Sequence, residues 1–394
     1  MSGTIIRLIR STDTGAPVIN GTQASLTAAL KAVLQDGFNP RTIQSITRSG
    51  STATVTFTEA HGYNPDGLTK ILLAGIDQAE YNGIFEPFNV TTLSVDITVT
   101  GSPITPATGA SMTAKVAPLG WSEVFSATGK SVFRSNEVTG TRLYLRVDDT
   151  GAATTDSYRS ALIRGYETMT DVDTGTGPFP TVANHPNGLY VTKSFTLDAT
   201  PRNWIIIGDG FEFFLLLAHG YSSTANVYTS HHFGDPASEM ASDPFGCLIY
   251  GSTTTNYNGW PDATTSAILN NFGPQAGHFM ARSYTQTGSS ITVGKQGNYT
   301  AGGNNIGGTG AIGYPAPLNN GIYHSPVTVH ESASGVIRAF LKGIYQPLHV
   351  RPLGNGGLLP ANLSPIGRRL FAVATPYSSS TAGESHFDID GPWR

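Results

Sequence analysis

Short apolar runs that alternate with polar residues, separated by glycine-containing turns, follow one another along most of this chain. The clearest pair is Ile205–Ile207 and Phe211–Leu217, which meet at Gly208–Asp209–Gly210. Glycine can adopt the positive φ that a tight hairpin demands, so we expect these two runs to form a β-hairpin with the glycines in that conformation. The pattern predicts a mainly β protein.

One segment has the helical period instead. In Ser25–Leu34 the apolar residues recur along one face at spacings of three and four, and Gly37 follows the end of the segment. This spacing predicts an α-helix, and Thr22 or Ser25 is the expected N-cap.

Further strands are predicted from apolar alternation and from β-branched or aromatic residues between turn signals. Their character changes near Pro118–Gly120, where a meander of short strands gives way to longer ones. Before this point the expected strands are Thr42–Ser49, Ser51–Thr58, Ile71–Leu73 and Ser111–Val116. After it they are Ser131–Arg134, Thr141–Val147, Ser160–Thr168, Leu189–Lys193, Phe245–Tyr250, Val327–His330, Val336–Tyr345 and Arg369–Thr375.

The strand pattern predicts two parts. Residues 1–118 are expected to form a small β-barrel-like module with one α-helix, and residues 119–394 a larger antiparallel β-sandwich with long glycine-rich loops. Loop excursions are expected at 251–266 and 295–322. A glycine-rich tract cannot build a dense side-chain core, so we expect these loops to lie over a neighbouring surface.

Composition narrows the class of protein. Only 13% of the residues are charged and 10% are aromatic, which is typical of a folded chain and not of a disordered one. The formal net charge of −4 argues against nucleic acid as a partner, because nucleic-acid binding needs clustered Lys and Arg.

The sequence also indicates where the protein is made. Its single cysteine, Cys247, lies in an apolar run and is expected to be buried and inert. The first residues lack the pattern of a signal peptide, and no stretch approaches the roughly 20 apolar residues of a membrane span. We therefore expect synthesis in a cytoplasm.

Signals for catalysis are weak. The chain has no Walker A sequence and no Gly-x-Ser-x-Gly elbow, and after His330-Glu331 a serine, Ser334, stands where a zincin has its second histidine. No spacing singles out a pair of carboxylates for glycoside hydrolysis among Asp148, Asp149, Asp235 and Asp243. We predict that the protein is not an enzyme and has no cofactor.

Two clusters have some features of metal sites. His231 and His232 are adjacent, and neighbours on a strand point to opposite faces, so the expected arrangement is a polar strand edge. The Asp171–Asp173 loop resembles the start of a calcium loop, but Gly175 and Val182 stand where such a loop has oxygen ligands. Whether either cluster binds a metal stays open.

Aromatic residues in or beside polar loops are the better lead to function. They are Tyr250, Tyr257, Trp260, Tyr284 and Tyr299. Such rings contact a protein partner, stack on a sugar or fill the local loop core, and protein contact is the reading we favour. Trp393, near the end of the chain, is expected to be held against its own domain or a neighbour. The candidate interaction residues are Tyr257, Trp260, Tyr284, Tyr299 and Trp393.

Several longer segments carry a further signal, in order and over most of the chain. They are GAPVINGTQASLTAALKAVLQDGF, ATVTFTEAHGYNPDG with EYNGIF, AKVAPLGWSEVFSATGKSVFRS, LYLRVDDTG, IRGYETMTDVDTGTGPFP, HHFGDPASEMASDPF and FDIDGPWR. These segments resemble a family of virion structural proteins of tailed double-stranded DNA bacteriophages, associated with the tail or baseplate. The His-Gly-Tyr at 61–63 and the Tyr-Asn-Gly at 81–83 also resemble a small β-barrel module of phage tail proteins.

The resemblance implies a non-enzymatic structural subunit of the virion, assembled in the host cytoplasm and located in the tail. We expect a homo-oligomeric adaptor that docks on other virion proteins through strand edges, glycine-rich loops and both ends of the chain. One alternative is a receptor- or glycan-binding tail-tip protein that attaches to the host surface. Another is a capsid decoration or collar protein.

Overall fold

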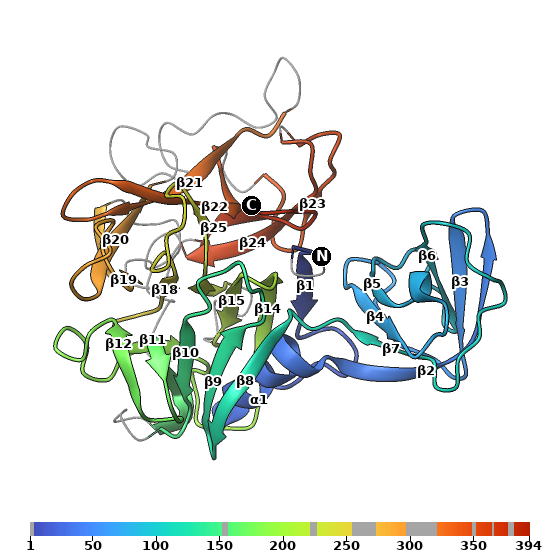
Figure 1. Cartoon of the computed structure of the whole chain (residues 1–394), viewed down its shortest axis with the longest axis horizontal. Helices are drawn as coiled ribbons and strands as arrows, with labels where there is room; N and C mark the ends of the chain where they lie inside the picture. Colours follow the sequence, from blue (N-terminus) through green and yellow to red (C-terminus); the bar gives the residue numbers. More distant parts are fainter. Residues whose placement is uncertain are drawn as a thin grey trace.

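The computed structural model describes residues 4–151, 157–220, 227–253, 273–296, 321–348, 352–364, 366–376 and 382–394. Three antiparallel β-sheets account for most of this structure, so the predicted mainly β fold is confirmed. Two of the sheets form a large body, and the third forms a smaller one beside it (Figure 1).

The smaller body comprises residues 38–116, which we call the module. Its sheet has six strands in the order β5-β4-β7-β2-β3-β6. They are β2 (Phe38–Ser49), β3 (Thr52–Phe57), β4 (Ile71–Ala74), β5 (Gly83–Phe85), β6 (Ser94–Thr98) and β7 (Thr113–Val116), with a 3-10 turn η2 at Ala79–Tyr81. A bridge between Phe88 and Asp96 joins the segment after β5 to β6, so the sheet closes into a barrel. The paired strands β2 and β7 connect the module to the large body (Figure 1).

The residues before the module belong to the large body. Strand β1 (Arg7–Arg10) pairs with β14 (Asn203–Gly208), nearly two hundred residues away. Helix α1 (Ser25–Lys31) continues into a π-helical turn, η1 (Ala32–Asp36), beside β8. The end of β7 lies close to the boundary predicted at 118, whereas β1 and α1 lie outside the module.

Helix α1 is capped by a residue from far along the chain. Its N-cap, Ala24, has a left-handed conformation and contributes no side-chain hydrogen bond. Instead, the carboxylate of Asp149 accepts the N–H of Leu26 at 2.8 Å. The prediction that Thr22 or Ser25 caps the helix is therefore wrong, because a tertiary contact satisfies the N–H that a local cap would bind.

The main sheet of the large body has thirteen strands, in the order β1-β14-β15-β16-β18-β19-β20-β21-β22-β25-β24-β23 with β17 on β22. Beyond β14 the strands are β15 (Glu212–Ala218), β16 (Thr229–Gly234), β17 (Ala237–Ser238), β18 (Leu248–Tyr250), β19 (Gly273–Met280), β20 (Ile291–Gln296), β21 (His324–Glu331), β22 (Ile337–Pro347), β23 (Leu358–Leu359), β24 (Leu370–Pro376) and β25 (Ala382–Asp388). The sheet curls, since Tyr228 beside β16 donates its N–H to Ala374 of β24. The curl encloses a core made by apolar residues of β1, β15, β24 and β25.

A second sheet packs on the other face of β14–β16. Its order is β12-β11-β10-β9-β8, with β13 on β11. The strands are β8 (Trp121–Ala127), β9 (Lys130–Ser135), β10 (Tyr144–Asp148), β11 (Ser160–Met169), β12 (Gly175–Phe179) and β13 (Leu189–Thr192), and a 3-10 turn η3 (Ser157–Arg159) precedes β11. The Trp121 ring centroid lies 5.4 Å from that of Phe213 and 5.9 Å from that of Phe233. The large body is therefore sandwich-like, as predicted.

The β14–β15 hairpin forms as predicted, but its glycines serve a different purpose. Neither Gly208 nor Gly210 has a positive φ. The side chain of Asp209 folds the turn, because its Oδ1 accepts the N–H groups of Phe211 and Glu212. A Cβ on Gly208 would lie 2.5 Å from the carbonyl oxygen of Glu212, and one on Gly210 would lie 2.7 Å from the side chain of Glu137. These two positions require glycine because neighbouring atoms leave no room for a Cβ, and not because the backbone has a positive φ.

Two other expectations concern the cysteine and the loops. Cys247 is buried, and burial raises the pKa of its thiol well above the ordinary value, which agrees with an inert thiol. Most of the predicted excursions at 251–266 and 295–322 fall outside the described residues. None of the helices in the described part of the chain has the length and apolar character needed to cross a bilayer.

Candidate functional site

The module meets the large body through charged side chains. Arg10 of β1 donates to both carboxylate oxygens of Asp66, at 2.6 and 3.2 Å. Arg369, just before β24, pairs with Glu86 at 2.7 Å, and Lys70 lies 3.6 Å from the same carboxylate. Asp66, Lys70 and Glu86 belong to the module, so two of these ion pairs, Arg10–Asp66 and Arg369–Glu86, join the two bodies.

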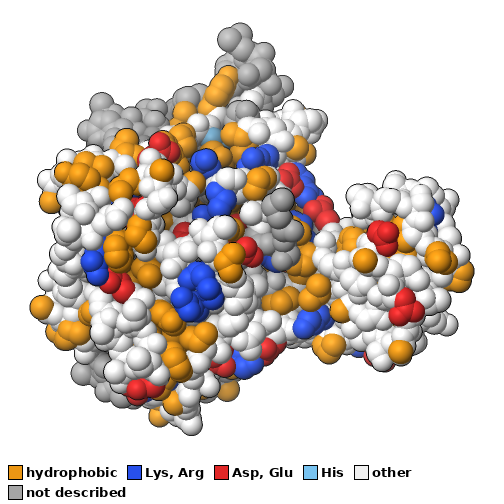
Figure 2. All heavy atoms as spheres, in the orientation of Figure 1, with side chains coloured by type: hydrophobic (Ala, Val, Ile, Leu, Met, Phe, Trp, Pro, Cys, Tyr) orange, Lys and Arg blue, Asp and Glu red, His pale blue; other side chains and the backbone are white. Residues whose placement is uncertain are grey.

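The ion pairs of this junction are partly exposed, and a buried hydrogen bond lies beside them, in which the hydroxyl of Thr69 donates to the carboxylate of Asp13 at 3.0 Å. The side chains of Asp66 and Glu86 are 36% and 39% exposed, and exposed ion pairs contribute about 0–1 kcal/mol each. Leu68 of the module packs against the core of the curled sheet, and a second apolar core contains buried residues of both bodies, among them Phe38 and Leu119. Figure 2 shows the module as a separate lobe with charged side chains near the junction.

Reversing one charge at the junction should open it. Glu86→Arg places a cation opposite Arg369 and Lys70, so we expect a larger radius of gyration at low salt and a smaller difference at high salt, where the charges are screened. Small-angle X-ray scattering measures both. Glu59→Arg is the matched control, because Glu59 pairs with Arg41 inside the module. An unchanged radius for Glu86→Arg at low salt would show that these pairs do not hold the module.

A cavity of about 800 Å³ opens on the large body where β17, β22 and Arg394 meet. Its volume is in the range of small-molecule sites. The apolar part of its wall includes Phe211, Pro236, Met240 and Pro244, and the polar part includes Thr139, Ser242, Asp235, Asp243, Lys342 and Arg394.

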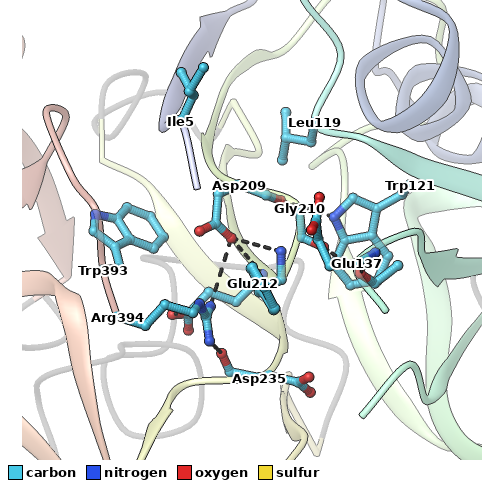
Figure 3. A network of polar contacts seen from close by, with 12 residues as sticks. Ile5, Leu119, Trp121, Glu137, Asp209, Gly210, Glu212, Asp235, Trp393 and Arg394 are labelled. Carbon is cyan, nitrogen blue, oxygen red and sulfur yellow. Dashed lines mark hydrogen bonds and ion pairs between the residues drawn. The ribbon is translucent and has the colours of Figure 1, made fainter. Parts of the chain in front are cut away.

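Arg394 links this cavity to a buried charge network (Figure 3). Its guanidinium lies 4.0 Å from the centroid of the Phe211 ring and donates to the carbonyl oxygen of Asp235 at 2.6 Å. It also pairs with Glu212 at 3.3 Å and with Asp209 at 3.8 Å. Burial raises the pKa of Asp209 to about 6, although Arg394 opposes that shift. The network fixes the position of Arg394 in the cavity wall.

Two carboxylates of the cavity wall are also held in place. Asp235 accepts the N–H and the hydroxyl of Thr141, both at 2.6 Å. Asp243 pairs with the buried guanidinium of Arg338 at 2.5 Å. Two fixed carboxylates, an exposed Lys342 and an apolar wall are a combination that suits a polar ligand with an apolar face, such as a sugar.

The two adjacent histidines are not at a strand edge, which corrects the sequence-based expectation. Strand β16 pairs with β15 on one side and with β18 on the other, so His231 and His232 lie inside the sheet and are buried. His232 contacts Glu212, with its Nε2 2.8 Å from the carboxylate. Among the described residues no group of three or more potential ligands is arranged to hold a metal ion.

His231 should make the protein less stable in acid. Burial lowers the pKa of this histidine to about 3, whereas an unfolded chain has a pKa near 6.5. Between these values the unfolded state binds more protons, so stability falls as the pH falls, by up to about 1.4 kcal/mol per pH unit. Urea unfolding at pH 7, 6 and 5 should show this loss in the natural protein and a shallower one in His231→Leu. Equal slopes would contradict the assignment.

The carboxylates of the acidic loop at 171–173 already contact other groups of the protein. The carboxylate of Asp173 contacts the ammonium of Lys130 at 2.8 Å and the guanidinium of Arg146 at 2.6 Å. Asp171 accepts the backbone N–H groups of Asp173 and Thr174. These contacts leave the loop as an ion-paired turn.

The candidate aromatic residues have different environments. Tyr257, Trp260 and Tyr299 lie outside the described residues. Tyr284 is 45% exposed, and its N–H donates to the carboxylate of Glu331. The structure places Trp393 in the interior, where its indole N–H donates to the carbonyl oxygen of Asp388, because its large apolar ring completes the core of the curled sheet.

The residues that make the junction and the cavity network could not be identified from local sequence. Arg394 and Glu212 are 182 positions apart, and Arg369 and Glu86 are 283 apart. Neither pair follows a motif. No protein-family model matches this chain, and no curated protein matches it.

Proposed function

We propose that this protein is a structural, non-enzymatic adaptor subunit of a tailed-phage particle, in its tail or baseplate. In this role the large body is built into the particle, and the module docks on a neighbouring copy or on another virion protein. The proposal rests on the sequence resemblance and on one structural observation, the projecting module.

The module supports an adaptor role in three ways. It is a closed barrel, so it has few free strand edges. It is joined to the large body by two paired strands and by exposed ion pairs. It also carries exposed apolar side chains, of which Ile104 is the most exposed at 71%. These exposed apolar side chains offer a partner protein a surface to pack against.

Labelling intact particles tests the proposal. An epitope inserted at Gly335, an exposed turn between β21 and β22, marks the large body, and one at Gly50, between β2 and β3, marks the module. We expect electron microscopy to find the Gly335 label at the tail end and the Gly50 label to be hidden or to block assembly. Label on the head would indicate a decoration or collar protein instead. Absence of the protein from purified virions, judged by mass spectrometry, would refute a virion role.

The cavity favours a second candidate, a tail-tip protein that binds a host glycan. Under this alternative Lys342→Ala should reduce adsorption to cells while particles still assemble. Lys342 is suitable because its side chain is exposed in the cavity wall. Normal adsorption by the variant would leave the adaptor role as the better supported one.

A further inference from the structure

We propose that Lys193 and Asp149 condense to form an intramolecular isopeptide bond, a covalent cross-link inside the large body. Asp149 follows β10 and Lys193 follows β13, and these two strands pair with β11. Asp149 also caps α1 through Leu26. The amide would therefore tie β10, β13 and the start of the helix together.

The two side chains are in contact and sealed from water. The Nζ of Lys193 lies 2.5 Å from Oδ1 of Asp149, and both side chains are 0% exposed. The same Nζ lies 3.1 Å from Oγ of Ser25 and 2.7 Å from the carbonyl oxygen of Thr22. Fixing an amine against a carboxyl group removes the entropy cost of bringing them together, for which effective molarities reach about 10⁵–10⁸ M.

Burial favours the neutral groups that react. Removing a Lys–Asp ion pair from water costs several kcal/mol per ion. Burial raises the pKa of Asp149 to about 6 against the opposing effect of Lys193, and it lowers the pKa of Lys193. Transfer of one proton from the ammonium to Oδ1 gives a neutral amine beside a neutral carboxylic acid, and lysine is a nucleophile in that form.

Condensation then needs no further reagent. The Nζ of Lys193 bonds to Cγ of Asp149, and the N–H of Leu26, 2.8 Å from Oδ2, stabilises the negative charge that develops on this oxygen. A second amine proton passes to Oδ1, which lies within hydrogen-bond distance of Nζ. The Cγ–Oδ1 bond breaks, Oδ1 leaves as water, and one secondary amide remains. Atoms and charge balance, because an amine and a carboxylic acid give an amide and water.

The test is the intact mass of the unfolded full-length chain. We expect it to be lower than the sequence mass by one water, and peptide mapping should find one branched peptide containing both residues. Lys193→Arg keeps a cation for the ion pair but should have its full sequence mass. The control is Lys31→Arg, because Lys31 pairs with Asp36 at 2.6 Å on the surface, and this variant should still lose the water.

A second variant keeps the test decisive if Lys193→Arg does not fold. In Asp149→Asn the condensation releases ammonia instead of water and gives the same amide, so its final mass should equal that of the natural protein. A natural protein at its full sequence mass would overturn the proposal and leave a buried ion pair. Loss of water that persists in Lys193→Arg would also overturn it, because the water would then come from elsewhere.

Discussion

Trp393→Ala is expected to lower the free energy of unfolding by about 3–5 kcal/mol, the cost of emptying a large aromatic site in a core. The Trp393 ring is 0% exposed, and its centroid lies 5.7 Å from that of Phe214 in β15. Its removal would leave a cavity between the two sides of the curled sheet. Urea unfolding followed by circular dichroism measures the loss. The control is Tyr284→Ala, whose half-exposed ring should contribute within about 0.5 kcal/mol.

Gly343 provides an independent check of the same packing. A Cβ on Gly343 would lie 2.5 Å from the Trp393 ring, so Gly343→Ala should also destabilise the protein. In the Trp393→Ala background the clash is absent, and the cost of Gly343→Ala should fall. The double-mutant cycle therefore gives a coupling energy between the two sites. Additive effects, or a loss below about 1 kcal/mol for Trp393→Ala, would show that the ring does not hold the sheet together.

The strands were predictable where apolar residues recur between turn signals. Thr42–Ser49 falls within β2, Ser160–Thr168 within β11, and Val336–Tyr345 nearly coincides with β22. Burial does not alternate strictly in them, since the first six residues of β11 are all buried, but their buried apolar residues still mark the strands in the local sequence. The mainly β class and the sandwich-like body follow from the number of such strands.

What local sequence could not show is which distant segments meet. Strand β1 lies before the helix in the chain, yet it pairs with β14, which is nearly two hundred residues away. Only tertiary packing selects this partner. Helix α1 ends at Lys31, short of the predicted Leu34, and the carbonyl oxygens of Val33 and Leu34 accept N–H groups from Leu119 and Gly120. The ion pairs of the junction and the contacts of Arg394 are of this distant kind. Asp235 and Asp243 were among the candidate carboxylates of the sequence, but only the structure shows that both lie in the wall of one cavity.

Arg338→Met is the other change expected to have a large effect. The buried guanidinium of Arg338 pairs with Asp243 at 2.5 Å and with Glu331 at 2.7 Å, and both carboxylates are nearly inaccessible to water. Methionine removes the cation and leaves two buried carboxylates unpaired, which typically costs about 3–5 kcal/mol. Urea unfolding at pH 7 measures the loss. The matched control is Lys130→Met, because its pair with Asp173 is exposed and should contribute at most about 1 kcal/mol.

A triple variant separates the cost of unpaired charge from the value of the network itself. Arg338→Met combined with Asp243→Leu and Glu331→Leu removes all three charges, and buried ion networks replaced by apolar residues often recover stability. We expect this variant to be more stable than Arg338→Met alone. Asp243 lines the cavity, so the recovered protein would lack one of its two fixed carboxylates. If the triple variant were as unstable as Arg338→Met, unpaired buried charge would not be the cause of the lost stability. The cause would then be the lost packing of the Arg338 side chain.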